Sequence, residues 1–354
     1  MASEGKNLVG VDIGTTSIKV CEIREDRKGA RSLVRFGFHP LPPQTIVDGH
    51  IMNAGAIVDG LDRLFHKAKN RERDVALRVS GHSVIIKKIT MPVMTAAELA
   101  EQINWEAEQH IPFELADVQI DYQVVNRREE EGQMDVLLVA AKKEEIGDLT
   151  NLAIEAKLRP RIVDLDAFTV QNCFEFAYGA PPTDQTVVLL HVGASLTTIN
   201  ILSQGTTAFT RDVVNGGNAI TEEIQRQLGV SHEEAEAYKC GSAAGMVPEE
   251  VPNIMRDVVE ALAGEIQRSL DFYLATSGEQ EISKVYLSGG TANVPVLHEE
   301  LAQRCQVDVA VLDPLLVAQP DPKSVDPLAL QGRTSQAVVA YGLALRKDRE
   351  KRPS

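Results

Sequence analysis

The stretch from Leu8 to Val20, LVGVDIGTTSIKV, constrains the fold more than any other part of the chain. Val9, Val11 and Ile13 alternate with small or polar residues, which is the period of a half-buried strand, and the alternation resumes at Ile18. The pattern therefore predicts a strand, a tight glycine turn and a returning strand. A dinucleotide-binding fold or a P-loop would place a helix after its glycines, so neither of these folds agrees with the sequence.

The predicted turn, Gly14-Thr15-Thr16-Ser17, would present backbone N–H groups and hydroxyls in a concave arrangement of the kind that binds phosphate oxygens. Asp12 precedes this turn within an apolar strand, where a bare carboxylate would be costly to bury. A magnesium ion, bound to Asp12 directly or through water, would remove that cost. Taken alone, the stretch is equally compatible with an ordinary edge hairpin whose aspartate is solvated.

Composition narrows the class of protein. At 354 residues the chain is long enough for roughly two domains, since domains average about 150 residues. Its 44% apolar and 25% charged residues are typical of a soluble globular protein, and the net charge of −15 argues against nucleic-acid binding and direct attachment to anionic lipid. The cysteines are scattered without CxxC pairs, which predicts reduced thiols rather than disulfides or a zinc site: Cys21, Cys173, Cys240 and Cys305.

Neither a targeting signal nor a membrane span is predicted. Residues 1–6 lack the basic start and apolar core of a signal peptide. Residues 185–210 carry no formal charge, but polar residues such as His191 and Asn200 interrupt them too often for a transmembrane helix. We therefore expect a cytoplasmic protein.

The opening pattern occurs a second time near residue 187. There the sequence predicts a strand over 187–192, a turn at Gly193-Ala194-Ser195, a returning strand over 197–202 and a third strand over 206–212. The first copy likewise continues into a predicted third strand over 31–38. An internal duplication with a cleft between the two halves is the simplest explanation.

Between the copies, residues 93–160 are predicted to form a separate α–β–β–α unit, after a run of strand-like alternation over 75–89. Thr95 and Glu98 have the spacing of a capping box, which opens a helix to about His110. After the second copy come predicted helices over 218–228, 231–239 and 253–276, a strand over 284–287, the glycine turn Ser288-Gly289-Gly290-Thr291, and helices over 294–305 and 336–345.

Read together, these elements resemble the superfold of actin, Hsp70 and the sugar kinases, a duplicated α/β fold of ribonuclease H-like topology whose two domains clamp a nucleotide. Residues 9–20 resemble its first phosphate loop and residues 189–202 its second. Residues 163–172 and 337–345 resemble the two connecting helices, and residues 284–301 the adenosine motif. A single glycine turn is weak evidence, but five motifs in this order over nearly the whole chain are strong.

The inserted unit resembles that of the cell-division protein FtsA. A closer resemblance is to the PilM family of type IV pilus assembly proteins, and it runs from about residue 7 to 346. The motifs that carry it are Val-Gly-Val-Asp-Ile-Gly at 9–14, Ile-Thr-Met-Pro at 89–92, and the segments Asn215–Thr221 and Glu234–Lys239.

The resemblance implies a division of the chain into subdomains. The expected boundaries are 1–92, 161–185 and 332–346 for the first actin-like domain (1A), 93–160 for an FtsA-like insert (1C), 186–215 and 283–331 for the second domain (2A), 216–282 for a helical subdomain (2B), and 347–354 for a charged tail.

It also implies ATP and Mg²⁺ as cofactors. Phosphate would be bound by Gly14, Thr15, Thr16, Ser17, Lys19 and Gly193, with Asp12 orienting the hydrated metal. Lys19 could neutralise phosphate charge, but it is equally compatible with a solvent-facing strand lysine.

Two further groups of residues complete the implied nucleotide site. Gly216, Gly217 and Asn218 precede a predicted helix, whose free N–H groups and positive dipole end would face phosphate. Glu236 and Lys239 share a helical face and would contact the ribose, although the pair alone would suit a surface ion pair. Gly289 and Gly290 would let the backbone approach the adenosine, because a Cβ there would obstruct it.

One position departs from the superfold. Its active members open the second phosphate loop with an acidic residue, and His191 stands there in this chain. An imidazole cannot replace a carboxylate in a magnesium–water shell. Asp166, at the start of the first connecting helix, remains the candidate catalytic residue that could polarise a water. We therefore expect nucleotide binding with very slow hydrolysis or none.

The PilM resemblance implies a nucleotide-responsive scaffold. Its partner would be the N-terminal cytoplasmic peptide of PilN, held in a groove between 1A and 1C whose walls are the insert's sheet and the helix that contains Trp105. Other implied partners are the assembly ATPases and inner-membrane platform of the pilus machine. Contact with the membrane would be through partners, because residues 346–354 form no amphipathic anchor.

Two alternatives remain open at this stage. A metabolic kinase of the same superfold would need a general base beside a substrate pocket, and both the insert and His191 count against it. A self-polymerising filament protein like FtsA is the other alternative.

Overall fold

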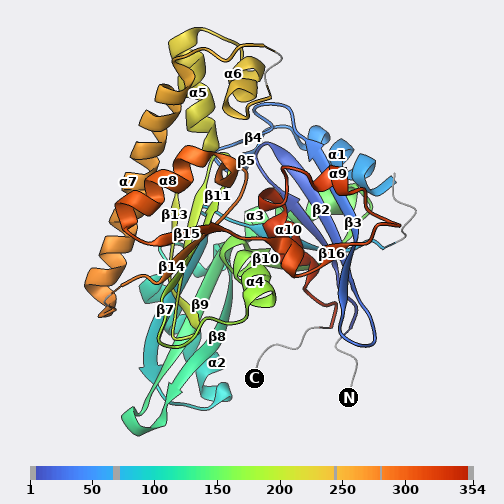
Figure 1. The fold of residues 1–354 in the computed structure, drawn as a ribbon. Coiled ribbons are helices and arrows are strands. Elements are labelled where there is room, and N and C mark those ends of the chain that lie inside the picture. Colours follow the sequence, from blue (N-terminus) through green and yellow to red (C-terminus); the bar gives the residue numbers. More distant parts are fainter. Residues whose placement is uncertain (1–4, 67–71, 243–244, 280, 350–354) are drawn as a thin grey trace.

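The computed structural model describes residues 5–66, 72–242, 245–279 and 281–349 (Figure 1). Two sheets with the same topology organise it, in the orders β10-β6-β1-β2-β3-β16 and β13-β12-β11-β14-β15. In each, three antiparallel strands continue into two parallel ones. The first sheet comprises β1 (Val9–Ile13), β2 (Ser17–Glu25), β3 (Arg31–Pro40), β6 (Asp74–Val79), β10 (Arg159–Leu165) and β16 (Gln319–Pro320). The second comprises β11 (Val187–Val192), β12 (Thr197–Ser203), β13 (Thr206–Val213), β14 (Lys284–Ser288) and β15 (Asp308–Val311).

The two opening hairpins also close in the same way. The N–H of Gly14 donates to the carbonyl of Ser17 at 3.0 Å, and the N–H of Gly193 donates to the carbonyl of Leu196 at 2.9 Å. The turn that joins β1 to β2 is thus repeated between β11 and β12. The duplicated actin-like fold expected from the sequence is confirmed.

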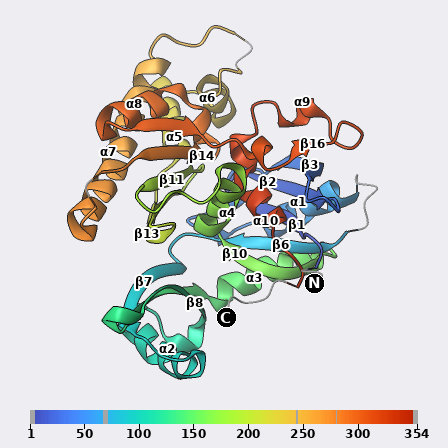
Figure 2. The same cartoon turned by 60° about the horizontal axis from the view of Figure 1, so that its bottom comes forward.

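Two connecting helices lie between the sheets, α4 (Asp166–Tyr178) and α10 (Val338–Ala344) (Figures 1 and 2). Helix α4 packs against β11 and β12, α10 packs against β1 and β2, and the two helices pack against each other. They approach so closely that a Cβ on Gly342 would lie 1.9 Å from the carbonyl oxygen of Thr169. A glycine at this crossing is therefore what allows both sheets to share one core.

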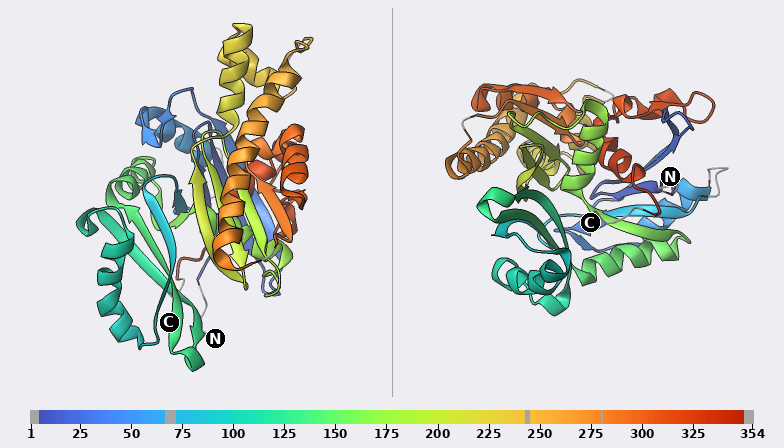
Figure 3. Two further views of the ribbon diagram at one scale, coloured as in Figure 1. Left: turned by 90° about the vertical axis from the view of Figure 1, so that its left-hand side faces the viewer. Right: turned by 90° about the horizontal axis from the view of Figure 1, so that it is seen from below.

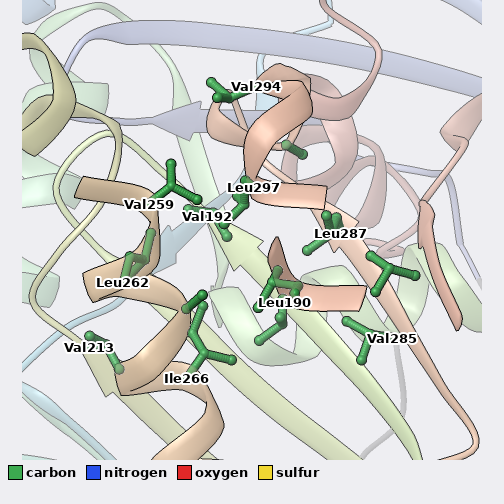
Figure 4. Close-up of a cluster of buried hydrophobic side chains, with 14 of the residues drawn as sticks. Leu190, Val192, Val213, Val259, Leu262, Ile266, Val285, Leu287, Val294 and Leu297 are labelled. Atoms are coloured by element: carbon green, nitrogen blue, oxygen red, sulfur yellow. The ribbon is translucent and has the colours of Figure 1, made fainter. Parts of the chain in front are cut away.

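The second domain is built on the longest helix, α7 (Val251–Ser277). Its buried Val259, Leu262 and Ile266 pack against side chains of the second sheet such as Leu190 and Leu287 (Figure 4). One face of the helix predicted over 253–276 therefore belongs to the core. The remaining elements of the two domains are β4 (Ile46–Val47), β5 (His50–Ile51), α1 (Ala54–His66), α5 (Gly217–Leu228), α6 (His232–Lys239), α8 (Pro295–Cys305), α9 (Pro327–Leu330) and short 3-10 turns at 291–293, 314–316 and 335–337. Two further 3-10 turns, at 115–117 and 129–131, belong to the inserted unit.

The inserted unit begins earlier than the sequence suggested. Its sheet has the order β7-β9-β8, from β7 (Val84–Pro92), β9 (Gln133–Lys142) and β8 (Val118–Arg128). The alternation over 75–89 is therefore two strands, because Gly81, with φ of +86°, turns the chain between β6 and β7. At the other end, α3 (Lys143–Glu155) buries Leu152 in the same core as Val9 and Ile57, so it packs on the first domain. Strand pairing thus gives the unit residues 84–142, not 93–160.

Helix α2 (Ala96–His110) begins at the predicted capping box, with Thr95 and Glu98 bonded reciprocally. It covers one face of this sheet by burying Leu99, Ile103 and Ala107. The view of Figure 3 shows the sheet lying between α2 and the rest of the molecule. Helix α2 therefore cannot form a wall of a groove between the insert and the first domain. The side chain of Trp105 on this helix is 71% exposed to solvent.

Within the described residues, no helix combines the length and the apolar character needed to cross a bilayer.

The α4–α10 crossing can be tested by adding a single methyl group. Gly342→Ala should destabilise the protein by about 3 kcal/mol, because the new Cβ overlaps the backbone of α4 and one of the helices must move. Gly147→Ala, in α3 where a Cβ would meet nothing within 4 Å, is the matched control and should stabilise the protein by roughly 0.5–1 kcal/mol. Urea unfolding followed by circular dichroism measures the unfolding free energy of both variants. Equal changes would contradict the close packing of α4 against α10.

Candidate functional site

Three charged residues meet where parallel strands of the first sheet end. Asp12 lies on β1, Arg78 on the adjacent β6, and Asp166 directly after β10. Arg78 donates from Nε to Asp12 Oδ1 and from Nη1 to Asp166 Oδ2, each at 3.0 Å. It also donates to the hydroxyl of Ser80. Arg78 therefore bridges two carboxylates that are almost completely buried.

Lys19 completes the pairing of Asp12. It lies opposite Asp12 in the β1–β2 hairpin, and its Nζ is 3.2 Å from Asp12 Oδ2. Burial would raise the pKa of Asp12, but the charges of Lys19 and Arg78 outweigh it and hold this pKa below its usual value. Of the two interpretations left open for Lys19, the solvent-facing strand lysine is thus excluded, because its side chain is only 13% exposed.

Asp166 is in a different electrostatic state. Burial raises its pKa to about 7, against the opposing charge of Arg78 and with added repulsion from Asp12. Its second oxygen, Oδ1, is buried and has no hydrogen-bond partner among the described residues. Near neutral pH this carboxyl is therefore divided between its neutral and ionised forms.

His191 holds, in the second repeat, the position that Asp12 holds in the first, two residues before the turn glycine. Its Nδ1 lies 3.0 Å from the hydroxyl of Ser288. Burial lowers the pKa of His191 to about 4, so the ring is neutral at physiological pH. The two hairpins thus bring one ionised carboxylate and one neutral imidazole to the site.

The first phosphate turn is partly occupied by its own hydrogen bonds. The N–H of Gly14 is used to close the turn, and Ser17 is buried as the first residue of β2. Thr15 is half-buried and Thr16 is exposed. The groups that remain open to a ligand are thus at Thr15 and Thr16.

The start of α5 differs from the expectation. The N–H of Gly217 donates to the carbonyl of Gly193 at 3.0 Å, and the N–H of Asn218 donates to the carbonyl of Ala194 at 2.7 Å. The turns pack so tightly that a Cβ on Gly216 would lie 2.6 Å from the oxygen of Gly193. Gly216-Gly217-Asn218 is therefore not an open anion site in this structure, because the second phosphate turn already accepts its N–H groups.

Glu236 and Lys239 form an ion pair at 2.6 Å, but it is not an ordinary surface pair. The Lys239 side chain is 9% exposed, and its Nζ also donates to the carbonyl of Gly217 and the hydroxyl of Thr221. Lys239 therefore joins α6 to the start of α5. Glu236, whose side chain is 43% exposed, is the member of the pair that a ligand could reach.

The adenosine turn closes against the same loops. Gly289 has φ of +92°, and a Cβ on it would lie 2.2 Å from the carbonyl oxygen of Val192. The hydroxyl of Thr291 donates to the carbonyl of Gly193 at 2.9 Å, and Gly290 lies beside Gln336. The structure thus brings together the predicted residues of the second domain around the turn at Gly193.

Sequence reasoning missed Arg78 and Thr291. Arg78 lies within the short apolar run Asp74–Val79, where a buried guanidinium is as costly as the buried carboxylate that drew attention to Asp12. That cost was the available signal: a cation and an anion on apolar strands imply that they pair.

The donor set fits magnesium poorly. Both oxygens of Asp12 already face cations, Arg78 and Lys19. Across the parts of the chain that the structure describes, no group of three or more His, Cys, Asp or Glu side chains could hold a metal ion. The burial cost that led us to expect a metal at Asp12 is met by the protein's own cations.

Known structures define the class of protein. The ethanolamine utilization protein EutJ from Carboxydothermus hydrogenoformans matches with a TM-score of 0.57 at 15% identity, over 96% of this chain and 89% of that one. MreB5 of Spiroplasma citri bound to ADP matches with a TM-score of 0.54 at 13% identity, over 96% of this chain and 95% of that one. The protein therefore has the two-domain, actin-like fold.

The family follows from two further matches. A chain of a PilM–PilN type IV pilus biogenesis complex matches with a TM-score of 0.84 at 26% identity, over 97% of this chain and 98% of that one. The family model described as type IV pilus assembly protein PilM matches residues 10–348. The chain belongs to this family, as the resemblance indicated.

The environment of Asp166 predicts a pH dependence of stability. Because its pKa rises from 3.8 in the unfolded chain to about 7 on folding, proton binding stabilises the fold at low pH, and this contribution is lost as the pH rises to 7. Relative to Asp166→Asn, the wild type should therefore lose about 1.4 kcal/mol of unfolding free energy per pH unit over that interval. Urea unfolding at several pH values measures the slope, with the exposed Asp148→Asn as the control for the change of charge. Parallel profiles for wild type and Asp166→Asn would contradict it.

Proposed function

We propose that this chain is a nucleotide-binding scaffold of the type IV pilus assembly platform, which captures the N-terminal cytoplasmic peptide of PilN. The observation that carries the proposal is the match to a PilM–PilN complex over 97% of this chain, insert included. The protein would act at the cytoplasmic face of the inner membrane, held there by PilN. Further contacts would be with the assembly ATPases and the inner-membrane platform.

ATP is the ligand that the paired loops suit best. Lys19 and Arg78 bring positive charge to the first phosphate turn, Glu236 offers an accessible carboxylate for ribose hydroxyls, and Gly290 in the adenosine turn is half-buried and has no side chain to obstruct a base. Thr15 and Thr16 supply hydroxyls to phosphate. The magnesium ion expected at Asp12 is not part of this proposal, because cations already contact both of its oxygens.

Hydrolysis would be slow or absent. His191 is neutral where a carboxylate would be needed, and Asp12 is held between two cations. Asp166 is the remaining candidate to polarise a water, but one oxygen accepts from Arg78 and its pKa of about 7 leaves it only partly ionised. General-base catalysis needs a free, ionised group within reach of the attacking water, and this arrangement provides little of one.

We place the peptide site on the sheet face opposite α2. On that face Val84, Ile86 and Val139 are partly buried and pack toward Ile146 and Phe168, which belong to the first domain's side. The β8 positions that alternate to the same face, Gln119, Asp121 and Gln123, are exposed. An apolar floor beside an exposed, polar strand edge suits an extended peptide.

The first experiment is calorimetric titration of the cognate PilN peptide into the full chain with and without ATP. A tenfold tighter affinity with ATP would correspond to about 1.4 kcal/mol of coupling between the two sites. Absence of peptide binding, together with phosphate transfer from ATP to a small metabolite, would overturn the scaffold and favour the kinase alternative.

The position of the peptide site is tested by two substitutions on opposite faces of the insert. Val139→Asp should weaken peptide binding at least about tenfold, because it places a charge on the proposed apolar floor. Trp105→Ala, on the far side of α2, should leave the affinity unchanged within a factor of about two even though it removes a larger side chain. Thermal melting verifies that both variants are folded. The reverse order of effects would move the site to α2.

A further inference from the structure

We propose that Arg78 and Lys19 take the place of a divalent cation, so that this protein binds nucleoside triphosphate without Mg²⁺. The inference rests on the nucleotide-binding function proposed above and concerns how the triphosphate charge is neutralised. It assigns to Arg78 a binding role that follows from its place between the phosphate turn and two buried carboxylates.

Both carboxylate oxygens of Asp12 are already occupied by cations of the protein. A metal near Asp12 would need its carboxylate oxygens or the water next to them. Oδ1 of Asp12 accepts from Arg78 Nε at 3.0 Å, and Oδ2 lies 3.2 Å from Lys19 Nζ. Arg78 Nη1 also donates to Oδ2 of Asp166. The guanidinium thus lies between the two acidic groups that a metal would share.

Arg78 and Lys19 are also directed toward the phosphate turn. Both cations also reach the phosphate turn: the position of a Cβ on Gly14 would be 3.2 Å from Lys19 Nζ and 3.7 Å from Arg78 Nη2. Arg78 donates to protein groups through Nε and Nη1, whereas Nη2 carries no hydrogen bond within the described residues. A guanidinium has five N–H donors in a planar fork that matches phosphate geometry, so the free edge of Arg78 can donate to phosphate oxygens.

The positive charge of Arg78 and Lys19 opposes the binding of a metal ion. A divalent ion at Asp12 would lie close to Arg78 and Lys19, whose side chains are only 15% and 13% exposed, so solvent would screen the repulsion weakly. To reach the carboxylate, the metal would have to displace Arg78 from Asp12 and leave its Nε without a partner in a buried site. A triphosphate has the opposite effect, because it adds negative charge beside two cations.

The test compares ATP affinity of the full chain by calorimetry in excess Mg²⁺ and in excess EDTA. We expect the two dissociation constants to agree within about threefold. A loss of about thirtyfold or more in EDTA would overturn the inference while leaving nucleotide binding intact. Failure of ATP to bind in either buffer would overturn the nucleotide-binding function and this inference with it.

Variants at Arg78 give an independent measurement. Arg78→Gln removes one cation and opens Asp166 and Oδ1 of Asp12 to a metal, so the ratio of affinities in Mg²⁺ and EDTA should rise to about tenfold or more. Arg78→Lys keeps the charge and should keep the ratio near one, with weaker binding in both buffers because the fork is lost.

The matched control is Arg161→Gln, an arginine of β10 that pairs with Asp74 and is 51% exposed. It should leave both affinities unchanged. If Arg78→Gln retains the wild-type ratio, the inference is wrong. Should Arg78→Gln fail to fold, the wild-type ratio and Arg78→Lys decide the question by themselves, since a strong Mg²⁺ requirement in either would overturn it.

Discussion

The buried ion network of Asp12, Arg78 and Asp166 is the interaction around which the site is organised. Asp12 and Arg78 lie on adjacent parallel strands and Asp166 directly follows the third, so the sheet fixes their spacing. Removing one member would leave a charge unpaired in the interior, which costs more than the pair gains over an apolar core. The network therefore constrains both the register of the strands and the charge that faces a ligand. It also explains why a carboxylate can be buried on β1 without a metal.

The two halves of the site have the same fold but differ in the charge of one residue. The two hairpins close with the same hydrogen bond, yet one brings an ionised aspartate to the site and the other a neutral histidine. The loops of the second domain are packed against each other by glycines, and Lys239 fixes α6 to the start of α5. Such an arrangement suits a protein that holds a nucleotide and responds to it more than one that turns it over.

The insert carries the surface that we propose for the partner peptide. Its sheet has one face covered by α2, and its other face lies toward the first domain, so the two faces have different chemical roles. Because α3 packs in the core of the first domain, a change in that domain has a direct packing route to the base of the insert. Coupling between nucleotide and peptide would travel through these contacts.

Much of the fold could be predicted from the sequence because its signals are local. The two strand–turn–strand repeats and the capping box at Thr95 each depend on residues a few positions apart, and all are present in the structure. The predicted turns at Gly14, Gly193 and Gly289 are likewise present in the structure. Contacts between residues far apart in the sequence could not be predicted in this way. Arg78 was overlooked because its carboxylates lie on other strands, and the N–H groups of Gly217 and Asn218 were expected to be free because the carbonyls that accept them belong to a distant turn. The assignment of β7 to the insert's sheet and of α3 to the first domain also had no local signal. Hydrogen bonds and ion pairs between segments far apart in the sequence form only when the chain packs, and in this protein they determine which groups of the site remain available to a ligand.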